Sequence, residues 1–311
     1  MIKPVILVTG ADLAPQAIEI LKDFQIIYAG KAPRPEDIVT LCRQHNPVAI
    51  LLRYGKVTAE MMDAAPALKV ISKHGSGTDT IDKDAATERG IRVVAAIGAN
   101  ASAVAEHALT LLLACAKSTI ALNERMHSGY WDKATHKTIE LNGKTIGIIG
   151  LGAIGQKFAN MCNALGMRII GFDPYAKTVS EKIQLVDLDT IWRESDAISF
   201  HCPLTPENQN LLNENTLKNC KDGVIIINTA RGGLINEEAL MHAIKSNKVS
   251  MAGLDSFVTE PMTAPHPFHG NPRIVLSPHI GGVTNEAYIN MGIGAAENIL
   301  SALSSPKATK Q

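Results

Sequence analysis

The sequence lacks an excess of charge of either sign. Its 311 residues include 30 Lys and Arg and 30 Asp and Glu, so the formal net charge is 0 with neutral histidines. A neutral protein has no overall attraction to nucleic acid or to an anionic membrane surface. We therefore expect neither as a partner, and an anionic small molecule would have to be held by local groups.

Cysteine motifs and long apolar runs are also missing. The five cysteines are odd in number, and no two have C-x-x-C spacing, so neither a disulfide framework nor a metal site is expected. The longest apolar runs, such as residues 108–116, are too short to span a bilayer. The first residues run directly into a strand-like stretch without a signal-peptide layout. These absences predict a cytoplasmic protein.

What the sequence contains is an alternation of short apolar runs with helical patterns. Runs without polar alternation suit strands that are covered on both faces, as in a parallel α/β sheet. A chain of this length exceeds one typical domain core, so we expect two domains. The runs that predict buried strands are residues 5–8, 48–52, 69–71, 145–149, 168–172, 197–200, 224–228, 251–254 and 274–276.

One helical pattern is unusually long. It covers residues 101–126 and has a strongly apolar middle. We interpret it as a single helix that joins a first domain to a nucleotide-binding domain. Its apolar stripe suits either core packing or the surface of a homodimer, since symmetric dimers are the commonest oligomers.

The strongest local motif is rich in glycine. Gly150, Gly152 and Gly155 follow an apolar run and precede a helical pattern, in the G-x-G-x-x-G spacing of dinucleotide sites. The first glycine permits a tight turn, the second lets the backbone approach a diphosphate, and the third lets the helix pack closely on the strand. We predict that a diphosphate binds at the amino-terminal end of this helix.

An acidic residue completes the predicted cofactor site. The next apolar run is followed by Asp173, 18 residues after Gly155 (173 − 155). An acid about 20 residues beyond the glycines is expected to bind the adenosine ribose hydroxyls. A carboxylate there would repel a 2′-phosphate, and no arginine follows directly, so the sequence predicts NAD rather than NADP.

Three polar residues that follow later apolar runs suit one reaction. They are Arg231, Glu260 and His279, and we expect them to converge because ligands bind beyond the carboxyl ends of parallel strands. Histidine transfers protons near neutral pH, and a carboxylate beside it fixes its tautomer. Arginine offers a planar fork to a carboxylate. The combination predicts hydride transfer at C2 of a small 2-hydroxy or 2-oxo acid.

With these motifs the chain resembles the D-isomer-specific 2-hydroxyacid dehydrogenase family, and within it the short, phosphoglycerate-dehydrogenase-like branch. The resemblance covers nearly the whole chain. It implies an α/β fold of two Rossmann-like parallel-sheet domains: a discontinuous substrate domain, residues 1–98 with 286–311, and an NAD-binding domain, residues 99–285. Besides the glycine motif it rests on Gly75–Asp82, Val104–His107, Phe172–Tyr175, His201–Thr205, Asn228–Gly233, Gly253–Asp255, Glu260-Pro261 and Ser277–Gly282.

The resemblance also implies roles for single positions. Arg231 would bind the substrate carboxylate and carbonyl, Glu260 would pair with His279, and His279 would donate the proton. The implied cofactor-binding residues are Gly150, Gly152, Ala153, Ile154, Gly155, Asp173, Pro203, Thr205, Thr229, Ala230, Asp255 and Gly281. The implied substrate-binding residues are Arg53, Ser76 and Gly77, the last two through backbone N–H groups.

Three basic residues near the predicted substrate loop leave two interpretations open. Arg53, Lys73 and His74 could together bind a second anionic group, such as a phosphate, a sulfonate or a second carboxylate. Alternatively, Lys73 is solvated and Arg53 contacts the same single carboxylate as the loop.

The sequence therefore predicts an NAD-dependent oxidoreductase that interconverts a small D-2-hydroxy acid and its 2-oxo acid. 3-Phosphoglycerate and hydroxypyruvate are candidate substrates, and a homodimer is expected. The alternative is an NAD-sensing, corepressor-like binding protein without significant turnover, because such family members have similar cofactor residues. A Rossmann-like methyltransferase fits less well, since the full glycine motif with a ribose-binding acid suits a dinucleotide.

Overall fold

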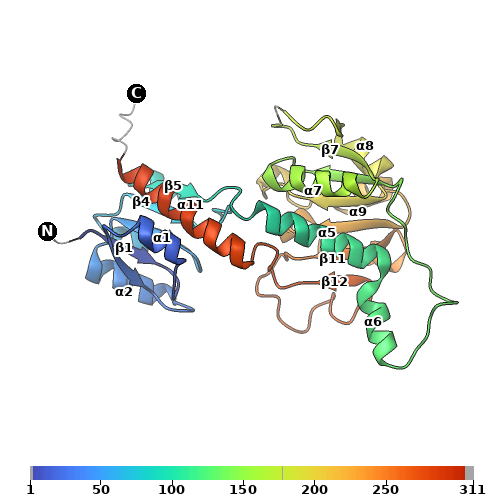
Figure 1. The fold of residues 1–311 in the computed structure, drawn as a ribbon, viewed down its shortest axis with the longest axis horizontal. Coiled ribbons are helices and arrows are strands. Elements are labelled where there is room, and N and C mark those ends of the chain that lie inside the picture. The colour runs from blue at the N-terminus through green and yellow to red at the C-terminus, as the bar shows by residue number, and fades with distance from the viewer. Residues whose placement is uncertain (1–2, 177, 305–311) are drawn as a thin grey trace. The chain divides into compact units, whose positions relative to one another are not determined.

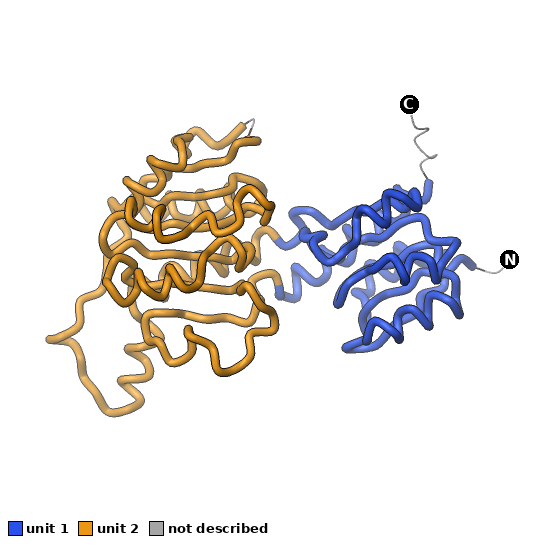
Figure 2. Tube along the Cα trace, turned by 180° about the vertical axis from the view of Figure 1, so that it is seen from behind, with its two compact units in different colours: residues 1–100, 283–311 blue, residues 101–282 orange. Residues whose placement is uncertain are grey.

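The computed structural model describes residues 3–176 and 178–304, and the chain divides into two compact units (Figure 2). Unit 1 comprises residues 1–100 and 283–311, and unit 2 comprises residues 101–282. The ends of the expected substrate domain, residues 1–2 and 305–311, lie outside the described residues. Each unit is built around one parallel sheet (Figure 1). The predicted fold class of two Rossmann-like parallel-sheet domains is confirmed.

Unit 1 has a five-stranded sheet with the order β2-β1-β3-β4-β5, and all its strand pairs are parallel. Its strands are β1 (Val5–Val8), β2 (Gln25–Tyr28), β3 (Ala49–Leu52), β4 (Val70–Lys73) and β5 (Arg92–Ala95). Its helices are α1 (Pro15–Ile20), α2 (Pro35–His45), α3 (Ala59–Asp63), α4 (Lys83–Glu88) and α11 (Asn285–Ser304).

Helices cover both faces of this sheet because its central strands β1 and β3 are apolar at every position. In β1, Leu7 packs with α2, α3 and α4, whereas Ile6 and Val8 pack with α1 and α11. The small residues Ala295 and Ala296 let α11 approach the sheet closely, and the Ser72 hydroxyl donates a hydrogen bond of 2.9 Å to the Ala295 carbonyl. The last helix of the chain is therefore part of the first unit's core.

Unit 2 has a seven-stranded parallel sheet with the order β12-β11-β10-β9-β6-β7-β8. Its strands are β6 (Thr145–Ile149), β7 (Arg168–Phe172), β8 (Ile183–Leu185), β9 (Ala197–Phe200), β10 (Val224–Asn228), β11 (Val249–Leu254) and β12 (Ile274–Leu276). Its helices are α5 (Ala101–Lys117), α6 (Thr119–His127), α7 (Ala153–Ala164), α8 (Leu188–Glu194), α9 (Glu214–Asn219) and α10 (Glu237–Lys245), with 3₁₀ turns η1 (Pro206–Asn208) and η2 (Gly232–Leu234).

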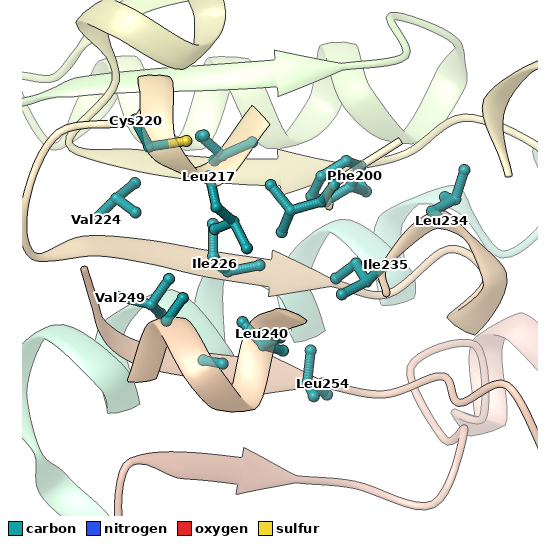
Figure 3. Close-up of a cluster of buried hydrophobic side chains, with 14 of the residues drawn as sticks. Phe200, Leu217, Cys220, Val224, Ile226, Leu234, Ile235, Leu240, Val249 and Leu254 are labelled. Atoms are coloured by element: carbon teal, nitrogen blue, oxygen red, sulfur yellow. The ribbon is translucent and has the colours of Figure 1, made fainter. Parts of the chain in front are cut away.

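The two faces of the second sheet carry separate apolar cores. Helices α5 and α7 pack on one face, where Phe158 is fully buried. Helices α8, α9 and α10 pack on the other, where Leu217 and Leu240 meet Phe200 and Ile226 of the sheet (Figure 3). Burial on both faces holds the strands rigidly, so the loops at their carboxyl ends start from fixed points.

The prediction of one helix over residues 101–126 is wrong. Ser118 adopts a left-handed conformation with φ 50°, and α5 and α6 are bent by 60° at this break. The apolar stripe of α5 is buried against the sheet and α7, whereas α6 has no buried residue. Of the described helices no single one has the length and hydropathy to cross a membrane, although this bent pair does when its two parts are joined.

Candidate active site

The strand orders place a ligand crevice at one point of each sheet. In unit 2 the order reverses between β6 and β9, and in unit 1 it reverses between β1 and β3. Loops that leave adjacent strands at such a point run to opposite faces, and ligands bind in the opening beyond the carboxyl ends. In unit 2 the glycine motif follows β6 and the segment from His201 to Thr205 follows β9. The glycine motif and the segment with Pro203 and Thr205 therefore lie where a doubly wound sheet binds its ligand.

Each glycine of the motif has a distinct spatial role. Gly150 has φ 96°, and a Cβ built there would lie 2.6 Å from the Cys202 nitrogen. A Cβ on Gly155 would lie 2.0 Å from the Gly150 carbonyl oxygen. A Cβ on Gly152 would meet nothing within 4 Å. The first and third glycines are thus required by packing, and the second leaves open space.

The groups around that space fit a dinucleotide. The first-turn N–H groups of α7, including those of Ala153 and Ile154, have no intrahelical partners, as in any α-helix. Its N-cap, Gly152, has no side chain that could accept from them. Asp173 is fixed beside the loop, since its Oδ2 accepts a hydrogen bond of 2.8 Å from the Leu151 N–H. Its oxygens retain lone pairs for ribose hydroxyls. The hydroxyl of Thr229 is buried and has no partner among the described residues.

A buried histidine lies under the same crevice. The His201 ring packs against Phe158 with a centroid distance of 5.0 Å, and its Nε2 lies 2.9 Å from the Ser199 hydroxyl. Its Nδ1 is buried and unpartnered among the described residues. Burial lowers the pKa of His201 to about 3, so the ring is neutral at physiological pH.

This burial predicts acid sensitivity. Below pH 6.5 the unfolded chain binds a proton at His201, but the folded chain does not until about pH 3. Stability should therefore fall as the pH drops through 6.5, by about 1.4 kcal/mol per pH unit for this one group. Urea unfolding of wild type and His201→Asn at pH 7 and pH 5 tests this. We expect a smaller loss in the variant, and equal losses would contradict the role of His201.

The predicted acid–base pair is present in unit 2. The Nδ1 of His279 lies 2.7 Å from the Oε2 of Glu260, and the other oxygen of Glu260 accepts a hydrogen bond of 3.0 Å from the Phe257 N–H. The two side chains are 44% and 36% exposed. Because a carboxylate only accepts hydrogen bonds, the proton sits on Nδ1, and the contact with Glu260 does not involve Nε2.

Arg231 lies on the neighbouring strand-end loop. The Asn228 side chain shapes this loop: its Nδ2 donates to the Arg231 carbonyl at 2.9 Å and its Oδ1 accepts from the Ala230 N–H at 3.0 Å. The next residue, Gly232, packs so closely that a Cβ would lie 1.9 Å from the Phe257 carbonyl carbon. The loops of Arg231 and Glu260 are therefore in backbone contact.

A buried carboxylate positions the His279 loop. Asp255 is 1% exposed, and it accepts hydrogen bonds from the N–H groups of Ile280 at 2.9 Å and Gly281 at 2.8 Å. His279 itself has φ 50°, a conformation that costs free energy in a residue with a side chain and persists only where neighbours enforce it. Asp255 supplies that enforcement.

Two further side chains complete this support. The Ser277 hydroxyl donates to Asp255 Oδ1 at 2.6 Å, and the Nε2 of His107 on α5 lies 2.8 Å from that hydroxyl. Burial alone would raise the pKa of Asp255, but hydrogen bonds from His107, Ser277 and the loop N–H groups outweigh it and keep the pKa low. Sequence reasoning did not assign roles to His107, Ser277 or Asn228, although all three lie within the quoted motifs.

The remaining predicted residues lie on strand-end loops. Pro203 and Thr205 belong to the turn after β9, where Asn208 accepts from the Thr205 N–H at 2.7 Å. In unit 1, Arg53 follows β3 directly, and Ser76 and Gly77 lie half-buried on the loop after β4. Arg231, Glu260 and His279 thus belong to unit 2, and the three substrate-loop residues belong to unit 1.

Two hollows in unit 2 lie away from these residues. They have volumes of about 170 and 240 Å³. The first is lined by residues such as Lys144 and Asp196 next to the amino-terminal ends of the strands, and the second lies beside Ser118 and Pro272. Neither contains a predicted site residue, so we attach no function to them.

Comparison with known proteins identifies the family. Residues 109–281, more than half of the chain, match the NAD-binding domain of the D-isomer-specific 2-hydroxyacid dehydrogenases. The chain belongs to this family. The predicted resemblance is confirmed, and so are the predicted cofactor, NAD, and the class of enzyme, an NAD-dependent dehydrogenase that acts on CH–OH groups.

Several relatives of this dehydrogenase are similar over most of its length. A hydroxypyruvate reductase of Thermotoga maritima is 44% identical over 80% of this chain and 82% of its own. A D-3-phosphoglycerate dehydrogenase of Archaeoglobus fulgidus is 43% identical over 79% of this chain but only 47% of its own, so the chain spans about half of that protein. A glyoxylate reductase structure from Paecilomyes thermophila has a TM-score of 0.87 at 31% identity, covering 98% of this chain and 97% of its own.

Proposed function

We propose that this dehydrogenase interconverts a small 2-oxo acid and its D-2-hydroxy acid with NAD(H), and that hydroxypyruvate and 3-phosphoglycerate represent its two candidate classes of substrate. The observation that carries the proposal is the 2.7 Å contact between His279 and Glu260. This pair lies next to the Arg231 loop, in the same unit as the dinucleotide site.

The residues present suit both directions of the reaction. NAD(H), when bound, supplies or accepts the hydride at C2. His279 gives a proton from Nε2 to the carbonyl oxygen during reduction and takes it back during oxidation. Glu260 stabilises the protonated ring and holds Nδ1–H, so that the ring keeps its orientation.

Anionic groups of the substrate have matching donors. Arg231 offers two parallel N–H groups to the carboxylate, and its charge favours the negative charge that develops on the oxygen. In unit 1, the backbone N–H groups of Ser76 and Gly77 are our candidate donors to an anionic group of the substrate. These assignments give each ionised group of a small 2-oxo acid a partner of opposite charge or a hydrogen-bond donor.

Loss of NADH absorbance with a panel of 2-oxo acids tests the proposal. We expect steady turnover with at least one acid of three or four carbons, abolished by heat denaturation and absent without acid. Tight NADH binding without turnover of any acid in the panel would contradict it and would support the NAD-sensing, corepressor-like alternative.

Asp173 is expected to set the preference for NAD. Replacing it with alanine removes the acceptor for the ribose hydroxyls and the repulsion of a 2′-phosphate. NADH affinity should fall by about tenfold or more, and the affinity for NADPH should approach that for NADH. Fluorescence titration with each cofactor measures both constants. Asp187→Ala, which removes an N-cap carboxylate of α8, is the control, and equal NADH and NADPH affinities in the wild type would contradict the assignment.

The predicted homodimer also has support in unit 2. Helix α6 has no buried residue, and the segment that contains it projects from the rest of the unit (Figures 1 and 2). Its exposed apolar side chains include Ile120, Met126, Tyr130 and Trp131, the last 77% exposed. Several large apolar side chains exposed on one projecting segment suit an interaction site, and we assign it to a second copy of the chain. Sedimentation equilibrium at micromolar concentration should give twice the chain mass; a monomer mass would contradict the assignment.

A further inference from the structure

Charged residues lie at the carboxyl ends of the strands of unit 1, where its sheet would bind a ligand. In the order β2-β1-β3-β4-β5 the reversal falls between β1 and β3, and sheets with this order bind ligands at that point. The residues Gly10 to Asp12 follow β1, and Arg53 directly follows β3. Asp12 and Arg53 therefore flank the crevice of the first unit.

Asp12 contacts one edge of the Arg53 guanidinium and holds it in place. The side chain of Arg53 is only 10% exposed, and its Nη1 donates to the Asp12 carbonyl at 2.6 Å and to the Asp12 carboxylate. The Tyr288 hydroxyl donates to the same carboxylate at 3.1 Å. The hydrogen bond from Arg53 holds the pKa of Asp12 below its usual range, so the carboxylate is ionised at neutral pH and neutralises the guanidinium.

Aromatic rings cover the faces of the same guanidinium. The Arg53 Cζ lies 5.0 Å from the ring centroid of Tyr288 and 5.2 Å from that of Tyr54. Stacked rings and an edge-on carboxylate fix the side chain in one orientation. Displacing Asp12 from Arg53 would break this ion pair. The positive charge of Arg53 is therefore already balanced by Asp12.

Of the other two basic residues only Lys73 adds a positive charge, so Asp12 halves the positive charge that a second anion would meet. His74 is 9% exposed, and burial, with a smaller contribution from Arg53, lowers its pKa to about 4; it is therefore neutral at pH 7. The Lys73 ammonium donates to the Arg53 carbonyl at 3.2 Å. With Asp12 ionised, the four residues carry two positive charges and one negative charge.

We propose that Asp12 selects substrates with a single anionic group, and so favours hydroxypyruvate over its phosphorylated form. This inference rests on the proposed function and narrows its substrate class. A phosphate brought to the crevice of unit 1 would either meet the negative charge of Asp12 or have to displace it from Arg53, and both cost binding energy. The uncharged hydroxymethyl group of hydroxypyruvate incurs neither of these costs.

The ratio of kcat/KM for 3-phosphohydroxypyruvate to that for hydroxypyruvate measures the selection. We expect the wild type to prefer hydroxypyruvate, and Asp12→Asn to raise the ratio by about tenfold. Asp12→Ser repeats the loss of charge with a different side chain. Because the Asp12 side chain is 68% exposed, neither variant should disturb the core.

Two further variants and a change of salt concentration distinguish the effect of the Asp12 charge from a purely structural effect of Asp12. Asp37→Asn removes another carboxylate of unit 1 that is paired with an arginine, Arg34, and it should leave the ratio unchanged. Tyr288→Phe removes a hydrogen bond to Asp12 but no charge, and its effect should be smaller than that of Asp12→Asn. Added salt should weaken the wild-type preference, since screening reduces repulsion at an exposed carboxylate; a merely structural role of Asp12 would not give this dependence.

The possible outcomes are distinct. Unchanged ratios in both Asp12 variants would overturn the inference. A wild type that uses the phosphorylated acid as well as hydroxypyruvate would also overturn it, yet would support the proposed function. A wild type that uses neither of these acids nor any other 2-oxo acid would contradict the proposed function, and the inference with it.

Discussion

Replacing His279 with alanine is expected to lower kcat for 2-oxo acid reduction by about two to four orders of magnitude, with little change in NADH affinity. The variant loses the Nε2 proton donor, and water has to supply the proton instead. The backbone of the loop should persist, because Asp255 holds the N–H groups of Ile280 and Gly281 rather than the imidazole. Stopped-flow or steady-state NADH oxidation, with a separate NADH titration, measures both quantities.

Glu260→Gln is the matched comparison for this experiment. Glutamine retains an acceptor for Nδ1 of His279 but has no charge to stabilise the protonated ring. We expect a smaller loss of kcat than in His279→Ala, because the imidazole and its hydrogen-bond acceptor both remain. Unchanged turnover in His279→Ala would remove this residue from the mechanism, and a large loss of NADH affinity would indicate that it acts through the cofactor site.

The second large effect concerns two glycines that are three residues apart. In Gly155→Ala the new Cβ would lie 2.0 Å from the Gly150 carbonyl oxygen, so helix α7 or the turn has to move. We expect NADH affinity to fall by about a hundredfold or more and the melting temperature to fall by several degrees, as overpacking costs about 1–3 kcal/mol.

Gly152→Ala separates cofactor binding from folding. Its Cβ would meet nothing within 4 Å of the protein, so the melting temperature without cofactor should stay close to that of the wild type. The methyl group would nevertheless enter the space assigned to the diphosphate, and NADH affinity should fall by about tenfold or more. Calorimetry and NADH titration on both variants give the comparison, and wild-type NADH affinity in Gly152→Ala would show that the diphosphate binds elsewhere.

Most of the fold follows from local patterns. The central strands were predicted because burial on both faces makes them continuously apolar, as in Ala49–Leu52 of β3. The strands that sequence reasoning missed, β2, β5 and β8, are three of the four edge strands of the two sheets and are only partly buried. An edge strand needs few apolar residues, so its sequence carries a weak signal.

The break between α5 and α6 could not be predicted from the hydrophobic patterns of the sequence. Residues on both sides of Ser118 favour a helix, and nothing in their spacing marks the change of direction. Tertiary packing ends α5, because its apolar stripe lies against the sheet whereas the residues of α6 have no core to contact. Packing therefore overrides local helical preference at this point.

The sequence by itself determined the cofactor motif and the family, and it predicted the reacting side chains, because each depends on residue types at short, fixed spacings. Only the tertiary structure decided how those side chains are supported: Asp255, Ser277 and His107 come from three separate elements to hold the His279 loop. The tertiary structure likewise decided the charge state of the crevice in unit 1. Asp12 and Arg53 are 41 residues apart in the chain, and whether a charge is neutralised depends on distances in space, which no short motif records.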